Sequence, residues 1–250
     1  MKQYSLTKIL TIWASVTAPM AALAFLAAPA LIVRTHLHPG LVYWMLMVLG
    51  MMWQFAVSLI VLWHELGNLN WRDVKERIRL NSPRDPETGQ SRRRLWWWVV
   101  PAMAANGLGV YVGSFLDTAW SDWLPGLEEP TYTQIAGLAT PAFQGQWWIL
   151  GLALTSCLFN YLLGEELLFR GVLLPKMNGV FGRWDWVANT LLFGLYHVHK
   201  VWFLPSIILS SFGIAWAAKR YRSMWMGVVV HGIEGYFIFL IVMVLMGMYP

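Results

Sequence analysis

The sequence has little charge for its length. Only 12% of its 250 residues are Asp, Glu, Lys or Arg, whereas 58% are hydrophobic. A single water-soluble core cannot bury that much apolar surface, so a soluble globular domain is excluded and a membrane protein is predicted. The sole cysteine, Cys157, excludes a disulfide framework and a cysteine-based metal cluster.

Several common catalytic motifs are also missing. His64 and Glu65 begin like the zinc-protease pattern HExxH, but Asn68 stands where that pattern has its second histidine. The sequence has no GxSxG elbow of the serine hydrolases and no glycine-rich nucleotide loop. These absences argue against a rhomboid-like protease and against an ATP-driven enzyme.

Apolar segments long enough to cross a membrane recur along the chain. A helix needs about 20 apolar residues to span a hydrocarbon core of roughly 30 Å. We therefore expect an all-α, polytopic transmembrane bundle that forms one domain from residues 1–250. The predicted spans are 9–33, 41–63, 95–116, 146–174, 185–199, 201–218 and 225–247.

Lysine and arginine are distributed unevenly among the connections. They precede the first predicted helix and follow the second, fourth and sixth, whereas the connection 117–145 has four acidic residues and no base. Because basic connections are retained in the cytoplasm, about seven spans follow, with the N-terminus inside and the C-terminus outside. We assign the net charge of +5 to this orientation and not to nucleic-acid binding. The expected location is a bacterial inner or plasma membrane.

The connection 64–94 is predicted to be a cytoplasmic, basic and amphipathic loop. Trp71, Val74 and Ile78 recur at helical spacing, which predicts a short helix on the inner leaflet. Its basic residues suit membrane lipid or a charged substrate segment, and a solvated topology signal is the alternative.

The third predicted helix carries a stripe of small residues, Ala105, Gly109 and Gly113. Such a stripe allows two helix backbones to approach closely. We therefore expect this helix to pack tightly against another one, within one chain or in a dimer.

Three charged residues, Glu165, Glu166 and Arg170, follow the apolar run that begins at Trp147. An isolated charge costs roughly 2.5–3.5 kcal/mol at the centre of a bilayer, so these charges need partners. Glu166 and Arg170 lie about 40° apart on a helix and are expected to pair. Glu165 lies about 140° from Arg170, which leaves its carboxylate as a candidate base.

Two histidines, His197 and His231, also stand within predicted helices. At 1.5 Å per residue they lie roughly 18 and 13 Å below the cytoplasmic ends of their helices, and Glu165 lies roughly 16 Å below its own. This matched depth on three helices predicts a single site.

That residue set suits two kinds of water activation. Glu165 can act as a general base, while one histidine shares the proton and the other stabilises negative charge. A Glu/His/His set can equally bind a zinc ion that activates water. The sequence leaves both alternatives open. His199 is expected to point elsewhere and to face the outer interface with His36 and His38.

The same region resembles a known family. Residues 164–171, GEELLFRG, resemble the EExxxR signature of the CAAX-protease and bacteriocin-processing family, also called Abi proteins. Residues 193–197, FGLYH, resemble its FxxxH motif, and residues 223–231 resemble the stretch that leads to its last histidine. Because order and spacing agree across 147–240, we predict that this range is a peptidase-like core.

The resemblance implies an intramembrane endopeptidase, similar to type II CAAX prenyl endopeptidases, with a site open to the cytosol. Its substrate would be a peptide or a lipidated protein, and its mechanism would depend on glutamate without a required metal, although a metallopeptidase mechanism has been proposed for the family. By this resemblance Glu165 and His197 activate water and His231 contributes to the oxyanion hole. The supporting residues would be Glu166, Arg170 and Phe193.

One position departs from the family pattern. The family commonly has Asn four residues after the last histidine, where this chain has Gly235. Loss of one oxyanion donor typically lowers a rate about 100- to 1000-fold. Glu234 is a poor replacement because its carboxylate would repel the oxyanion.

Two alternatives come from other classes. The first is a non-catalytic scaffold of the same fold that confers immunity to a bacteriocin or peptide by binding it, which the missing Asn favours. The second is a transporter, which would require inverted repeats or broken half-helices that the sequence does not show.

Overall fold

The computed structural model describes residues 2–123, 126 and 128–249, and helices dominate this part of the chain. It confirms the predicted all-α, polytopic bundle. Six helices in the described part of the chain are long and apolar enough to cross a membrane, so the chain is an integral multi-pass membrane protein. They are Leu6–Ile32, Pro39–Leu66, Arg93–Trp123, Trp148–Lys176, Asn178–Arg220 and Met224–Leu245.

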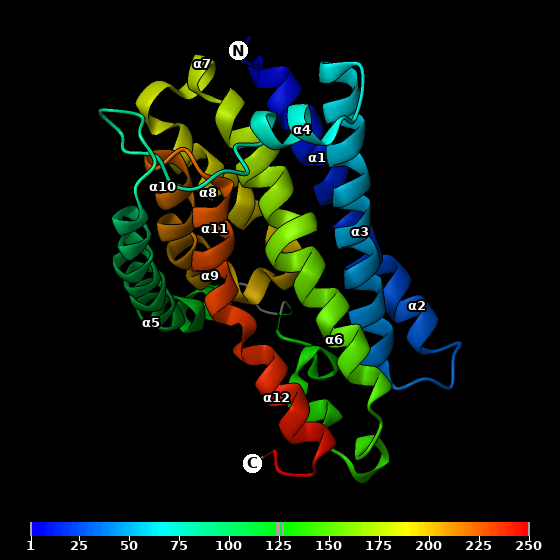
Figure 1. Ribbon diagram of the computed structural model, residues 1–250. Helices are drawn as coiled ribbons and strands as arrows, with labels where there is room; N and C mark the ends of the chain where they lie inside the picture. The colour runs from blue at the N-terminus through cyan, green and yellow to red at the C-terminus, as the bar shows by residue number, and fades with distance from the viewer. Residues whose placement is uncertain (1, 124–125, 127, 250) are drawn as a thin grey trace.

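Three of these long helices, Leu6–Ile32, Pro39–Leu66 and Arg93–Trp123, lie in the N-terminal half of the described chain (Figure 1). The first continues through Pro19 and Pro29 with a π-helical turn, η1, between them. The elements of the N-terminal half are α1 (Leu6–Ala22), η1 (Leu23–Ala27), α2 (Ala28–Ile32), α3 (Pro39–Leu66), α4 (Trp71–Arg77), η2 (Arg93–Trp98) and α5 (Val99–Trp123).

Short 3-10 turns lead from α5 to the second half, which carries the predicted site. The turns are η3 (Thr131–Thr133), η4 (Ile135–Leu138) and η5 (Pro141–Phe143). The fourth long helix comprises α6 (Trp148–Leu158), η6 (Phe159–Leu163), η7 (Leu167–Leu173) and η8 (Leu174–Lys176). After it come α7 (Asn178–Phe181), η9 (Gly182–Trp184), α8 (Asp185–Tyr196), η10 (His197–Phe203), α9 (Leu204–Ser210), α10 (Phe212–Arg220), α11 (Met224–His231), η11 (Gly232–Gly235) and α12 (Tyr236–Leu245).

The fifth long helix, 43 residues from Asn178 to Arg220, is a hairpin and not a single rod. The backbone of Lys200 leaves the helical region, with φ −125° and ψ 45°, and α10 then packs against α8. Lys219 pairs with Asp185 and joins the two ends of the hairpin. Its two arms correspond to the predicted spans 185–199 and 201–218, and the two chain termini lie at opposite ends of the bundle, as an odd count requires (Figure 1). The number of crossings and the orientation stay predictions.

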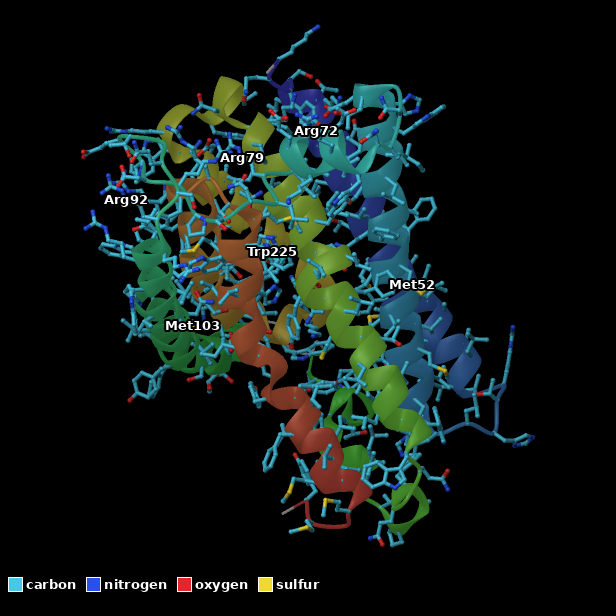
Figure 2. All side chains as sticks on the ribbon, in the orientation of Figure 1. Met52, Arg72, Arg79, Arg92, Met103 and Trp225 are labelled. Carbon is cyan, nitrogen blue, oxygen red and sulfur yellow. The ribbon has the colours of Figure 1, made fainter. Side chains whose placement is uncertain are left out.

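The basic connections meet at one end of the bundle, which we call the basic face. The amide of Tyr4 donates to the carbonyl of Lys176 at 3.0 Å, and the amide of Met224 donates to the carbonyl of Arg79 at 2.9 Å. Figure 2 shows Arg72, Arg79 and Arg92 toward this end, which also carries the N-terminus. The predicted grouping of these connections on one side is therefore confirmed.

The connection 64–94 contains the predicted short helix as α4. Val74 and Ile78 are buried against neighbouring helices, whereas Trp71 is 64% exposed. Arg77 anchors the end of α4, because its guanidinium donates to Glu65 at 2.7 Å and to the Tyr4 hydroxyl at 2.9 Å. Burial raises the pKa of that Tyr4 hydroxyl, since desolvation disfavours the phenolate. Most of the predicted apolar face is thus covered by protein, and contact with the inner leaflet stays a prediction.

The small residues of α5 pack against α9 within the chain. A Cβ at Gly109 would overlap the Leu209 carbonyl, and one at Gly113 would overlap the Ser206 backbone. Close packing of these two glycines is confirmed as intramolecular, whereas Ala105 lies on the exposed side of the helix.

Candidate active site

The fourth long helix changes its pitch at the predicted site. Two π-helical segments, η6 and η7, flank the residues from Gly164 to Glu166. π-helical turns occur frequently at functional sites, where they change the direction in which side chains point. Gly164 is required by close approach to α3, because a Cβ there would lie 3.0 Å from the Met51 carbonyl oxygen.

Glu166 links Arg170 to His231. Its Oε1 atom lies 3.1 Å from a guanidinium nitrogen of Arg170 and 3.0 Å from Nδ1 of His231. Glu166 and Arg170 are almost completely buried, so each compensates the charge of the other. Gly227 on α11 leaves room for the carboxylate, which a Cβ at that position would overlap. The predicted Glu166–Arg170 pair is confirmed.

Glu165 faces a different partner, His197 at the end of α8. Its Oε1 atom lies 3.5 Å from His197 Nε2. His197 Nδ1 lies 2.9 Å from the carbonyl oxygen of Phe193, and a carbonyl only accepts, so the Nδ1 proton is donated to it. A neutral His197 therefore has no proton on Nε2, and the lone pair of Nε2 points toward Glu165.

Phe193 packs at the centre of these groups. The guanidinium of Arg170 lies 4.1 Å from its ring centroid, a cation–π contact. The rings of His197 and His231 lie 4.7 and 5.8 Å from the same ring. One aromatic side chain therefore holds both histidines at the matched depth predicted from the sequence.

A cavity of about 370 Å³ adjoins the site and is lined by Glu165, His197 and His231. From there it extends along α3 and α12 to residues 132–135 and to Lys200. No lining residue in the described part of the chain comes from the basic connections. The lining gives no support to an opening on the side of the basic loops, and the cytosol-facing opening stays a prediction. Depth along a helix locates a site, but it does not reveal which end of the bundle is sealed.

Two side chains at the site were not predicted. With its amide nitrogen toward Glu165, Asn160 donates to both carboxylate oxygens at 2.9 and 3.1 Å. His199 is 4% exposed, lines the cavity and stacks on His197 with ring centroids 5.4 Å apart. The expectation that His199 points elsewhere assumed a continuing α-helix, whereas η10 is a 3-10 helix that breaks at Lys200. The HxH spacing was the available signal for His199, and Asn160, one turn before Glu165, had none.

Gly235 has open space around it, because a Cβ there would meet no atom within 4 Å. The nearest polar group to His231 Nε2 on this element is Glu234, whose Oε2 atom lies 3.6 Å away. The side chain of Glu234 is 46% exposed and lines the cavity. The position of the usual Asn is thus empty of side-chain atoms, and a carboxylate lies beside it.

The geometry does not assemble the zinc ligands considered above. Among the described residues, no group of three His, Cys, Asp or Glu side chains is arranged to hold a metal ion. His231 directs Nδ1 at Glu166 and Nε2 toward Glu234.

The fold and the site together define a polytopic membrane protein with a buried carboxylate–histidine pair at a cavity. Residues 142–237 match the family model described as Type II CAAX prenyl endopeptidase Rce1-like, which confirms the resemblance seen in the motifs. This range contains all six predicted site residues, and the family supports a peptidase role of the CAAX type. Comparisons with curated proteins and with solved structures find no match.

Proposed function

We propose that the chain is an intramembrane endopeptidase that hydrolyses peptide bonds in membrane-associated or lipidated proteins or peptides. The observation that carries this proposal is the pair of Glu165 and His197, whose facing atoms lie 3.5 Å apart beside the cavity. An ionised Glu165 and a neutral His197 with its proton on Nδ1 both accept a proton, so together they can orient and deprotonate one water molecule.

In the proposed reaction, the water oxygen forms a bond to the carbonyl carbon of the substrate while a water proton passes to Glu165. The negative charge that develops on the carbonyl oxygen is stabilised by the Nε2–H of His231, which acts as an imidazolium because its Nδ1–H is donated to Glu166. The carbon–nitrogen bond then breaks, and the proton held by Glu165 passes to the leaving amine. A new carboxyl terminus and a new amino terminus result, and no further reactant is needed.

Other buried groups keep this arrangement in place. Glu166 accepts from His231 and pairs with Arg170, and these contacts fix the imidazole ring from the side opposite the cavity. Phe193 fixes both histidine rings and, through its carbonyl, the tautomer of His197. Asn160 orients the carboxylate of Glu165.

One observation favours the non-catalytic alternative, a membrane scaffold or an immunity protein that binds a peptide. Glu234 lies 3.6 Å from His231 Nε2, where a negative charge opposes an oxyanion, and Gly235 supplies no donor. A binding site of this composition would still hold a peptide through its polar groups.

Peptide hydrolysis by the purified protein in detergent separates the two alternatives. The substrates are a library of lipidated and amphipathic peptides, and cleavage is detected by mass spectrometry. Glu165→Gln is compared with Glu87→Gln, an exposed carboxylate of the basic connection, each with and without a chelator. We expect cleavage that Glu165→Gln abolishes and that Glu87→Gln and the chelator leave intact.

Loss of cleavage with the chelator would replace the glutamate mechanism by a metal-dependent one. Binding of library peptides without cleavage, unchanged by Glu165→Gln, would overturn the enzyme proposal in favour of the scaffold.

A further inference from the structure

The path from the site to the basic face is closed. Between Glu165 and Lys176 the fourth long helix is buried throughout, and α8 covers it at the same depth. The amide of Asn189 on α8 donates to the carbonyl of Phe169 at 2.9 Å, which ties the two helices together in this layer. The side chains that fill the layer have no exposed surface: Leu168, Phe169, Val172, Leu173, Asn189 and Thr190.

The exposed part of the cavity wall lies on the other side of the site. Gln134, Lys200 and Tyr236 are the exposed residues among those that line the cavity in the described part of the chain. Lys200 forms the tip of the hairpin Asn178–Arg220, whose base is at the basic face. Tyr236 begins the last helix, α12. We call Gln134, Lys200 and Tyr236 the rim.

The basic face indicates which side of the membrane the rim occupies. Of the 18 lysines and arginines, 15 lie in or next to the basic connections in sequence, and Arg34, Arg170 and Lys200 do not. Such an asymmetry places the basic connections in the cytoplasm, because positively charged segments are translocated poorly. The connection that leads to Gln134 carries only acidic charge, which agrees with an outer location.

We infer that the substrate enters the cavity from the extracytoplasmic side of the membrane, opposite the basic face. The inference rests on the proposed peptidase function and narrows its substrate class to peptides or protein segments that reach the outer side of the bilayer. The cavity wall beyond the site is lined by Met20, Met47 and Met51, whose flexible thioethers suit apolar side chains of varied shape. The substrate is therefore an apolar, membrane-associated segment whose scissile bond reaches the site from the extracytoplasmic side.

Cysteine accessibility tests the inference in the full-length protein. In a Cys157→Ser background, single cysteines are introduced at the rim, as Gln134→Cys and separately as Lys200→Cys, and in the basic connection as the control Thr88→Cys. Thr88 and Gln134 are both exposed, so the two differ in the face on which they lie. Bacterial cells that express each variant are treated with a membrane-impermeant maleimide before and after permeabilisation, and labelling is normalised to that in detergent.

We expect the rim cysteines to react in intact cells as fully as in detergent, and Thr88→Cys to react only after permeabilisation. Labelling of the rim cysteines and the control cysteine from the same side of the membrane would overturn the inference. Labelling of the rim cysteines only after permeabilisation would overturn it as well. Rim cysteines that react in detergent alone would also overturn it, because no aqueous route would reach the cavity. Two rim positions keep the test valid when one variant fails to fold.

Labelling does not depend on activity, so the two proposals fail separately. A protein with an outward rim that cleaves no peptide would contradict only the peptidase function. An active protein with its rim in the cytoplasm would contradict only the entry side.

Discussion

At the scale of the residue, the site is a set of buried ionisable groups in which each has a defined partner. The pairing of Glu166 with Arg170 and the isolation of Glu165 from it follow from helical spacing, and both are found. Asn160 could not be predicted, because an amide in an apolar run is only informative once a π-helical turn brings it next to Glu165. His199 was misplaced because the prediction assumed α-helical geometry up to this residue, whereas His197–Phe203 is a 3-10 helix.

Replacement of Asn160 by Ala is expected to lower kcat while leaving KM nearly unchanged. A hydrogen bond to a charged group contributes about 1.5–3 kcal/mol, so the expected loss is roughly 10- to 100-fold. Asn160 positions Glu165 and is not expected to bind substrate in the ground state. Steady-state kinetics on a cleaved library peptide give the two constants. An increase in KM with kcat intact would show that Asn160 binds substrate and does not position the base.

Introduction of the usual donor, Gly235→Asn, is expected to increase activity. The side chain has space, and a restored oxyanion donor is worth up to about 100-fold in rate. Gly235→Ala is the control, since it adds a Cβ without a donor and should leave kcat unchanged. If both variants have the wild-type kcat, the oxyanion is stabilised elsewhere and Gly235 plays no part in the reaction.

At the scale of the element, tight packing of α5 on α9 depends on glycine. Gly113→Ala would push a Cβ into the Ser206 backbone, and overpacking of this kind typically destabilises by about 1–3 kcal/mol. Gly107→Ala on the same helix meets nothing within 4 Å and should be neutral or stabilising by about 0.5–1 kcal/mol. The midpoint of thermal unfolding in detergent should therefore be lower for Gly113→Ala than for wild type, and for Gly107→Ala it should equal or exceed that of wild type. Equal midpoints for the two variants would show that these helices do not pack as described.

The two charged residues that pair across the hairpin Asn178–Arg220, Asp185 and Lys219, differ in their exposure to solvent. Asp185 has no exposed surface, whereas the Lys219 side chain is 30% exposed. Lys219→Met would leave a buried carboxylate without its partner, while Asp185→Asn would leave an ammonium that water can reach. We expect a larger decrease in thermal stability for Lys219→Met than for Asp185→Asn. The opposite order would mean that the ion pair does not close the hairpin.

The boundary between the predicted spans 185–199 and 201–218 coincides with the reversal of the chain at Lys200, so apolar runs located this turn. They did not show that the residues from Asn178 to Arg220 continue as nearly unbroken helix around it. The π-helical turns on each side of Gly164 were not predicted, because a nearly uniform apolar run has no periodicity that distinguishes a π-helical turn from an α-helical one.

At the scale of the whole molecule, charge distribution and hydropathy predicted the bundle and the grouping of basic connections, because both are summed over many residues. The direction of the cavity was not predictable in this way. It depends on which helices fill the space above and below Glu165, and these contacts join residues far apart in sequence, such as Asn189 and Phe169. The matched depth of Glu165, His197 and His231 agrees with their place at one cavity, but it carries no information on the end of the bundle to which that cavity leads.

The central claim is that Glu165 and His197 act together on one water molecule. A double-mutant cycle with Glu165→Gln, His197→Ala and the combined variant, measured as kcat on one cleaved peptide, tests it most directly. Groups that act as a unit are strongly non-additive, so the combined variant should be no slower than the slower single variant, each about 100- to 10,000-fold below wild type. Losses that multiply in the combined variant would contradict the claim, because the two residues would then act independently.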